Sequence, residues 1–478
     1  MAIVEAPSRT SVRAPLPGRR DPGIDLLRAI CVVGVVLLHA IMVGVTVVDG
    51  DPVFANASEG TWWIVPVSWC LQVMPLFFII GGFAGYLSFR RMQARGGTAV
   101  DFIATRVHRL LTPALWAIAL AGAALAALSV AGVPADLIAT AGFRYSQPLW
   151  FLGVFLGCQA LLPLLAQAHA RRPLITVAAL LVASASVDAA RAGTGFEGLG
   201  FLNLAFVWLA LQQIGFFLAD GTVERLPRAT RAIAGTVALT ALVVTFTTGI
   251  HSPNLIANIN PPTTALLLVG VVHLSAVSLV RGRVEEFSRR PVPAAFGAFV
   301  NRRTMTIYLW HMPVLLAMAG VSAVISLAGG IALPQPGSIA WWVSRPSWLA
   351  AALILTAAIA VPLTRIERKP SPALTGSSRR IVGAAALGVA SVVLLLVAGT
   401  TVLTAAVAVA GMLLALRISR RSHQTASDEG VADIVGVAQR PDHERHGAAH
   451  APTNAARDVS LVDGAREARD HGNHREGQ

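Results

Sequence analysis

The sequence predicts an all-α protein that crosses a membrane many times, as a polytopic bundle of ten core transmembrane helices followed by a hairpin of two. Composition gives the first indication, because 55% of the 478 residues are hydrophobic and only 13% are charged, whereas soluble domains are about 25% charged. Apolar segments then recur along the chain, each long enough to cross a hydrocarbon core of about 30 Å. A last apolar stretch, residues 381–416, is too long for one helix, so we divide it at Gly399-Thr400-Thr401 into two short spans.

The predicted core spans follow one another with short polar connections. They cover residues 25–47, 62–87, 110–132, 149–168, 174–190, 200–219, 232–250, 263–280, 304–328 and 347–364. Residues 1–23 are polar and rich in arginine and proline, so we expect a cytoplasmic arm before a membrane domain of residues 24–370. Residues 284–300, with charges and two prolines, indicate a surface segment, and residues 371–416 hold the additional hairpin.

The chain changes character after the hairpin. Residues 417–478 are rich in alanine, glycine, arginine, aspartate and histidine and have almost no aromatic side chains, so they cannot bury a core. We expect a disordered cytoplasmic tail. Metal binding by His443, His446 and His450 is the alternative, but their spacing is irregular and no cysteine joins them.

Cysteine usage points to neither a disulfide framework nor a metal centre. Cys31, Cys70 and Cys158 all fall inside apolar runs at unrelated spacings. We therefore expect no metal site and no permanently bound cofactor.

The charges between the spans predict the orientation of the chain. Of the basic residues in loops between spans, nearly all lie on the side of the N-terminus, including the single lysine, Lys369, whereas the opposite loops hold only Arg144, Arg191 and Arg345. Positively charged loops stay in the cytoplasm, so we expect an inner or plasma membrane protein with both termini cytoplasmic. A net charge of +13 would suggest a nucleic-acid partner for a soluble protein. Here the arginines orient the bundle, and no nucleic-acid partner is expected.

The first span carries the clearest functional signal. Arg28 and His39 are eleven residues apart, which is three helical turns plus about 20°, so both lie on one stripe about 16 Å apart along the axis. We expect them to face one cavity, with Arg28 at its mouth beside Asp25 and His39 near mid-membrane. Ionisable groups at that depth mark functional sites. The alternative is structural, because a membrane histidine can bond a neighbouring helix and an arginine can snorkel to the interface.

Three further motifs carry polar or aromatic groups at the ends of spans. Arg106 and Arg109 share a helix face before the third span and can address one phosphate, although orientation alone would also explain the pair. Gln147-Pro-Leu-Trp150 opens the fourth span, where a tryptophan is also a common interface residue. Tyr308-Leu-Trp-His311 in the ninth span is polar enough to indicate a cavity lining.

The tenth span closes on Arg365-Ile-Glu-Arg368. Its Glu367 is either a surface charge paired with arginines or a partner for the site.

In their order and content, these motifs resemble the acyltransferase 3 family of membrane acyltransferases. Arg28 and His39 look like the family's Arg-x10-His signature, and Arg106 and Arg109 match its Arg-x-x-Arg pair. The other similar stretches are Pro75-Leu-Phe-Phe-Ile-Ile-Gly-Gly-Phe83, Leu149-Trp-Phe-Leu152, Tyr308-Leu-Trp-His-Met-Pro313 and Ile366-Glu-Arg368. The resemblance runs from about residue 23 to 370. It departs from the family where Gly81 replaces a serine and where Lys369 precedes Pro370, and it leaves out the hairpin and the tail.

The resemblance implies transfer of an acyl group, commonly acetyl, from cytosolic acyl-CoA to a hydroxyl group. Family acceptors are mostly sugars of surface polysaccharides and glycolipids, or secondary metabolites, so the implied reaction is O-acetylation in the cell envelope. Acyl-CoA would be a donor substrate, and the acceptor and the lipid bilayer would be the other partners.

Elementary chemistry agrees with this implication. Attack of an alcohol on a thioester needs a base near the operating pH, and imidazole is the usual one. We therefore expect His39 to be the catalytic base, assisted by Arg28 and Asp25, and Arg106 and Arg109 to bind the polyanionic donor. The residues expected on the acceptor side are Trp150, Tyr308, His311 and Glu367.

Two other functions remain open from the sequence. A transporter or flippase with His39 and Arg28 in a proton or anion pathway would also need many spans and intramembrane ionisable groups, but the two halves of the chain show no internal repeat. A non-catalytic scaffold in envelope assembly would leave His39 unexplained.

Overall fold

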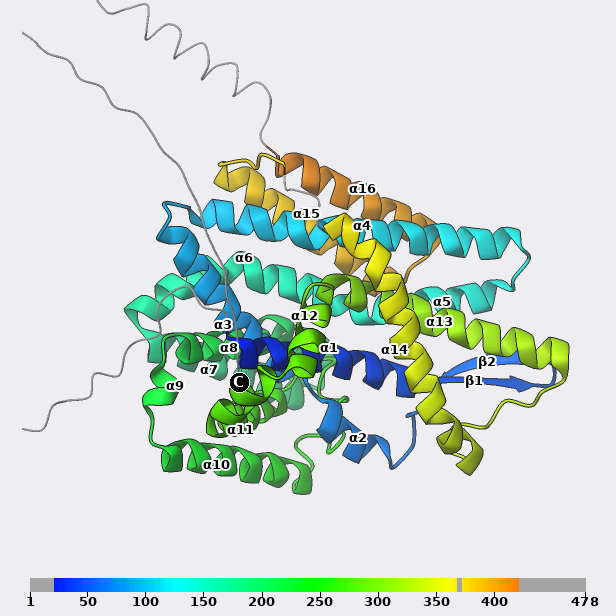
Figure 1. The fold of residues 1–478 in the computed structure, drawn as a ribbon, viewed down its shortest axis with the longest axis horizontal. Coiled ribbons are helices and arrows are strands. Elements are labelled where there is room, and N and C mark those ends of the chain that lie inside the picture. The colour runs from blue at the N-terminus through cyan, green and yellow to red at the C-terminus, as the bar shows by residue number, and fades with distance from the viewer. Residues whose placement is uncertain (1–20, 368–371, 421–478) are drawn as a thin grey trace, which may run out of the picture. The chain divides into compact units, whose positions relative to one another are not determined.

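The computed structural model describes residues 21–367 and 372–420, which form a helical membrane bundle with one short β-hairpin (Figure 1). Within these residues, eleven helices are long and apolar enough to cross a membrane, and α16 (Val402–Ile418) is a shorter apolar helix. This confirms the predicted class, a polytopic bundle with a C-terminal hairpin. The predicted arm (residues 1–23) and the predicted tail (residues 417–478) are described only in part. Pro22 and Gly23 already belong to the first helix, and Arg417 and Ile418 still belong to α16. The remainder of the arm and of the tail lies outside the described residues, so both stay predictions.

The core spans consist of single helices or of consecutive helices joined end to end. They are α1 (Pro22–Met42), α2 (Ile64–Leu71) with α3 (Met74–Gln93), α4 (Ala99–Val130), α5 (Ala135–Ser146) with η1 (Gln147–Leu149) and α6 (Trp150–Arg171), α7 (Pro173–Thr194), η2 (Glu197–Leu202) with α8 (Asn203–Ala219), α10 (Arg228–Thr247), α11 (Ala265–Ser288), α13 (Thr304–Gly329) and α14 (Ile339–Glu367). The short helices α9 (Thr222–Arg225) and α12 (Pro291–Asn301) connect spans, and α15 (Ser378–Ala398) turns into α16 at the predicted Gly399-Thr400-Thr401.

The first apolar run does not remain helical as far as predicted. Helix α1 ends at Met42, and β1 (Val43–Val48) pairs antiparallel with β2 (Asp51–Asn56). Most residues of β1 are β-branched, which favours a strand. Asp49 and Gly50 have φ of 52° and 88°, as a two-residue type I′ hairpin turn requires. Asp49-Gly50 is a strong hairpin signal. It was missed because hydrophobicity alone predicts that the apolar run continues as a helix.

Helix α4 begins eleven residues earlier than the predicted third span. Thr98 and Asp101 form a capping box, in which each side chain accepts from the backbone N–H of the other residue. The basic stretch behind this cap is therefore helical. Arg106 and Arg109, which we expected to precede the third span, therefore lie within its helix.

Helix α14 also begins earlier than predicted, so Arg345 lies within a span and not in a loop. Its guanidinium carbon lies 4.5 Å from the ring centre of Trp341 and 5.0 Å from that of Trp348. The two indoles shield the charge from the apolar surroundings, which explains why an arginine does not interrupt the helix.

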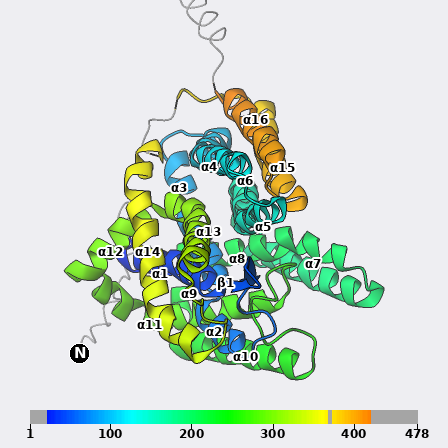
Figure 2. The ribbon, with the colours of Figure 1, turned by 90° about the vertical axis from the view of Figure 1, so that its right-hand side faces the viewer.

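Close approach of α3 and α8 holds the centre of the bundle. A Cβ on Gly82 would collide with the backbone of Gln212, and a Cβ on Gly215 would collide with the carbonyl oxygen of Ile79. Helix α1 also lies inside the bundle, where it contacts α11, α12, α13 and α14. Helices α15 and α16 pack on α4 and α6, at the side of the bundle (Figure 2).

We predict that Gly215→Ala destabilises the bundle, because the added methyl group must push α8 away from α3. The cost of such overpacking is about 1–3 kcal/mol, and it should appear as a lower melting temperature of the detergent-solubilised protein. Gly157→Ala is the matched control, since this helical glycine has open space around its Cβ position. Equal melting temperatures for the two variants would contradict backbone contact between α3 and α8.

Candidate active site

The start of α1 is fixed by its own polar side chains. Asp21 caps the helix, accepting from the backbone N–H of Ile24 at 3.0 Å, and Pro22 occupies the first helical position. One turn on, Arg28 Nη2 donates to Asp25 Oδ1 at 2.8 Å. The carboxylate and the guanidinium that the sequence places on one helix face are thus in direct contact.

Asn301, the last residue of α12, ties this pair to a second helix. Its Oδ1 accepts from Arg28 Nε at 2.7 Å, and its Nδ2 donates to the backbone oxygen of Asp25 at 2.7 Å. One amide therefore holds the position of both groups. The sequence did not single out Asn301, because a lone asparagine before two arginines forms no motif, and the predicted surface segment ended one residue earlier.

His39 lies about three turns further along α1, next to His311 of α13. The ring centroids are 5.0 Å apart, with an angle of 57° between the planes. Each Nδ1 faces a backbone carbonyl of its own helix, that of Val35 at 2.9 Å for His39 and that of Tyr308 at 2.5 Å for His311. A carbonyl oxygen only accepts, so each Nδ1 of a neutral ring carries the proton.

The two Nε2 atoms are consequently the proton-accepting atoms of the pair. His311 is fully buried, and its Nε2 has no hydrogen-bond partner among the described residues. Both rings line the same cavity. An imidazole held in one tautomer, with its basic nitrogen unprotonated, can accept a proton from a hydroxyl group that enters the cavity.

An aromatic wall continues from the histidine pair. Tyr308 donates its hydroxyl to the backbone oxygen of Pro148 at 2.8 Å and packs edge-on against Phe151. Trp150, the first residue of α6, stacks on the buried Trp208 with ring centroids 5.3 Å apart. Both Tyr308 and Trp150 line the cavity. The wall offers flat apolar faces close to the imidazoles.

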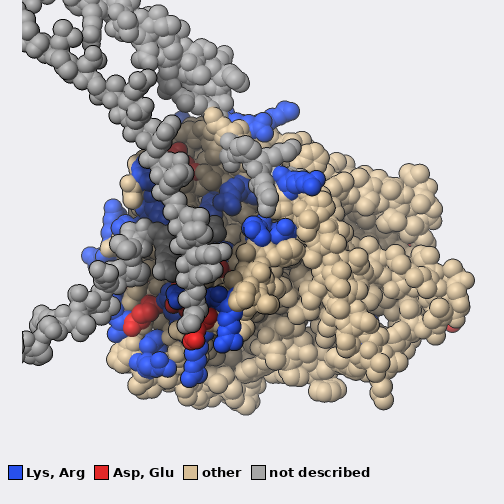
Figure 3. All heavy atoms as spheres, viewed as in Figure 1, with Lys and Arg blue, Asp and Glu red and all other residues tan. Residues whose placement is uncertain are grey.

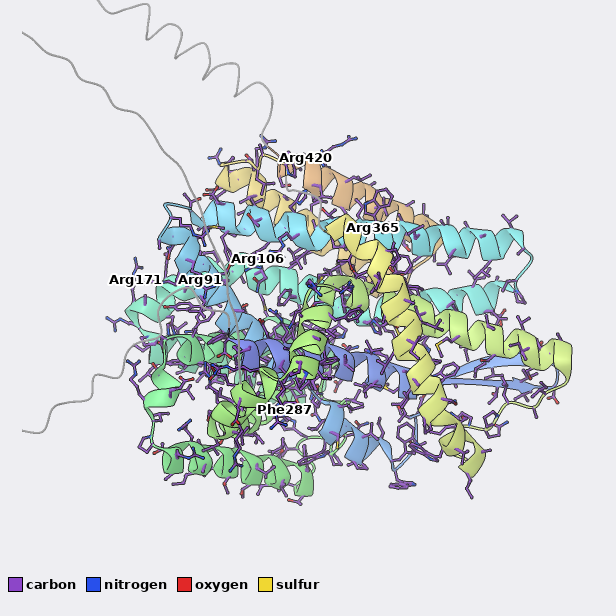
Figure 4. The ribbon with its side chains drawn as sticks, in the orientation of Figure 1. Arg91, Arg106, Arg171, Phe287, Arg365 and Arg420 are labelled. Carbon is purple, nitrogen blue, oxygen red and sulfur yellow. The ribbon has the colours of Figure 1, made fainter. Side chains whose placement is uncertain are left out.

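The opposite part of the cavity is lined by guanidinium groups, and we call it the arginine-rich end. Arg106 and Arg109 lie there on α4, and Arg106 packs over the ring of Phe102. The other arginines that line this end are Arg28, Arg91 and Arg302. Arginine side chains gather at the same end of the molecular surface (Figure 3). Arg91 and Arg106 are labelled there among the side chains in Figure 4.

One cavity of about 1510 Å³ joins these groups. Of the nine side chains predicted for the site, the eight that line it are Asp25, Arg28, His39, Arg106, Arg109, Trp150, Tyr308 and His311. The ninth, Glu367, is the last residue of α14, and its side chain lies outside the described part of the chain. His273 of α11 does not line the cavity. Arg91, Arg302 and Asn301 also line it without having been predicted for the site.

A second hollow of about 710 Å³ adjoins the cavity away from the arginine-rich end. The two share four lining residues, Met42, Phe143, Gln147 and Ile256. The second hollow is more polar, with Asn56, Ser58, Glu59, Arg144 and Asn254 in its lining.

The cavity can therefore bind an anionic group at one end, and deep inside its lining presents an uncharged, proton-accepting imidazole. Such an arrangement defines a multi-pass membrane protein with an internal polar site. The comparison with protein families matches residues 21–365 to the acyltransferase domain of the acyltransferase 3 family. The chain belongs to this family and is a membrane acyltransferase. Comparisons with curated proteins and with solved structures find no match.

We predict that Asn301→Ala raises the apparent KM for the acyl donor, because Arg28 loses one of the groups that orient it. Loss of a hydrogen bond to a charged group costs about 1.5–3 kcal/mol, so the increase should be about tenfold or more. The matched control is Asn203→Ala, which removes another interhelical asparagine, bonded to Asp188 at 2.9 Å, whose side chain does not line the cavity. If both variants lowered the melting temperature and neither changed the donor KM, Asn301 would have only a structural role.

Proposed function

We propose that the protein is an O-acyltransferase that moves an acyl group, preferentially acetyl, from acyl-CoA to a hydroxyl group of a carbohydrate, a glycolipid or a secondary metabolite. One observation carries the proposal: a single cavity joins an arginine-rich end to the proton-accepting histidine pair. Because the chain belongs to an acyltransferase family, we assign the arginine-rich end to binding of a polyanionic donor and the histidine pair to proton transfer.

The arginine-rich end would face the cytoplasm. The positive-inside rule favours this orientation, and acyl-CoA is a cytosolic metabolite, so its phosphates would enter at Arg106, Arg109 and Arg91. Guanidinium groups form strong, directional hydrogen bonds to phosphate oxygens. Arg28 would then lie between the phosphates and the reacting thioester, held there by Asp25 and Asn301.

His39 would act as the general base. Its Nε2 takes the proton of the acceptor hydroxyl while that oxygen attacks the thioester carbonyl carbon. A C–O bond forms, the C–S bond breaks, and the sulfur leaves as the thiol of coenzyme A after taking the proton back from the imidazolium. Water exclusion from the bundle would suppress hydrolysis of the thioester.

Tyr308, Trp150 and His311 would bound the acceptor. Aromatic faces suit the apolar faces of sugar rings, and His311 Nε2 is a further acceptor for a hydroxyl close to His39. We also propose Glu367 as a partner of the site, at the end of α14.

We predict that His39→Ala abolishes transfer while donor binding survives, since the donor's phosphates would bind at the other end of the cavity. Loss of a general base lowers the rate by about 10²–10⁴-fold. Transfer from radiolabelled acetyl-CoA and binding of acetyl-CoA would be measured on membranes with matched protein levels. His273→Ala is the control, because this histidine lies in a span but not in the cavity. Retention of more than about a tenth of the turnover would move the base to His311.

We predict that Arg106→Ala and Arg109→Ala each raise the KM for acyl-CoA and leave the acceptor KM unchanged. A charge-assisted contact contributes about 1.5–3 kcal/mol, equivalent to about tenfold or more in affinity. Arg171→Ala is a suitable control, since this exposed arginine at the end of α6 does not line the cavity. A double variant that changes only expression or orientation would show that the pair serves membrane topology alone.

A further inference from the structure

We propose that the cavity opens sideways into the bilayer between α5 and α15, and that this opening admits the hydrocarbon chain of a membrane-embedded acceptor. The acceptor would be an amphiphile, a hydroxyl-bearing head group on a long alkyl chain. This inference rests on the proposed acyl transfer and specifies the class of acceptor.

The opening is visible in side chains that line the cavity and are also exposed. Phe143 of α5 is 54% exposed, and Val393 and Val397 of α15 are 46% and 83% exposed, yet all three line the cavity. These side chains therefore lie at the boundary between the cavity and the outer surface. Leu396 completes the lining on α15. Val393, Leu396 and Val397 are spaced i, i+3 and i+4, so they form one apolar face.

Close packing fixes α15 in this position. A Cβ on Gly142 of α5 would collide with the backbone oxygen of Thr400, just after α15, and a Cβ on Gly388 would come within 2.8 Å of Leu111 of α4. The edge of the opening is therefore a built feature of the bundle. The α15 side of this edge lies outside residues 21–365, the part of the chain that matches the family. The C-terminal hairpin thus contributes one wall of the cavity.

The position of the opening along the bundle indicates what enters it. Val397 lies two residues before the α15–α16 turn, at the end of α15 remote from Arg379 and Arg380. Phe143 also lines the second hollow, together with the adjacent Arg144. A polar hollow and an apolar slot therefore meet at Phe143.

A polar hollow next to an apolar slot matches the two parts of an amphiphile, its head group and its alkyl chain. A polar head group would occupy the hollow and reach the histidine pair, while its alkyl chain would lie against α15 and extend into the lipid. A long acyl chain on the donor is the competing occupant of the slot. It would use the apolar face but would need no polar hollow beside it, so we assign the slot to the acceptor.

To test the proposal, the slot would be narrowed by the double substitution Val393→Trp and Val397→Trp. Val382→Trp is the matched control, because Val382 is 63% exposed, lies eleven residues before Val393 on nearly the same stripe of α15, and does not line the cavity. The proteins would be reconstituted in nanodiscs and supplied with acetyl-CoA and either methyl or dodecyl β-D-glucoside. Octanoyl-CoA with the methyl glucoside would form a third arm.

We expect the wild type and Val382→Trp to prefer the dodecyl glucoside by about tenfold or more in kcat/KM, because burying methylene groups is favourable. The double variant should lose that preference and keep its turnover of the methyl glucoside and its KM for acetyl-CoA. Equal use of both glucosides by the wild type would overturn the proposal. A selective loss of octanoyl transfer would assign the slot to the donor. Loss of turnover with every substrate, and of acetyl-CoA hydrolysis, would instead count against the proposed function.

A second measurement covers the case in which neither glucoside is acetylated. A dodecyl glucoside with a diazirine on the part of its alkyl chain next to the head group would be photo-crosslinked to the protein, and the labelled peptides identified by mass spectrometry. We expect labelling of the peptides that contain Phe143 of α5 and Leu396 of α15, which line the slot, in the wild type and in Val382→Trp, and its loss in the double variant. The same labelling in all three proteins would overturn the proposal.

Discussion

The contact of Asn301 with both Asp25 and Arg28 is the interaction on which the arginine-rich end of the cavity depends. An arginine in an apolar bundle is costly unless its donors are paired. Here one carboxylate and one amide each accept a hydrogen bond from Arg28, and the amide comes from another helix. The same contacts fix α12 on α1. At this site, the hydrogen bonds that orient the arginine are therefore also the ones that hold the two helices together.

The deep part of the cavity follows the same rule with uncharged groups. His39 and His311 give their Nδ1 protons to carbonyls of their own helices, so the backbone orients each ring and leaves Nε2 for the cavity. Helix α1 thus carries a guanidinium at one level and an imidazole about three turns away, both facing the same space. The donor that we propose has phosphates at one end and a thioester at the other, so its two ends would meet the arginines and the imidazole.

Much of this organisation could be predicted from the sequence, because span length and charge bias are strong signals in membranes. The stripe of Arg28 and His39 follows from helical periodicity alone, and the α15–α16 turn follows from a glycine followed by two threonines. Helix boundaries were less predictable. A hydrophobicity signal cannot separate the strand after Met42 from the helix before it, and it cannot show that a capping box extends α4 by eleven residues. Contacts between distant segments, such as that of Asn301, leave no trace in a single sequence. The same holds for the wall that α15 adds to the cavity.

The most direct test of the account is a cryo-EM structure of the protein with coenzyme A bound. We predict phosphate density at Arg106 and Arg109, and a pantetheine arm that passes Arg28 and ends with its sulfur beside the His39 Nε2. Nucleotide density at any other surface, or a sulfur that ends remote from both histidines, would contradict the claim that one cavity joins donor binding to proton transfer.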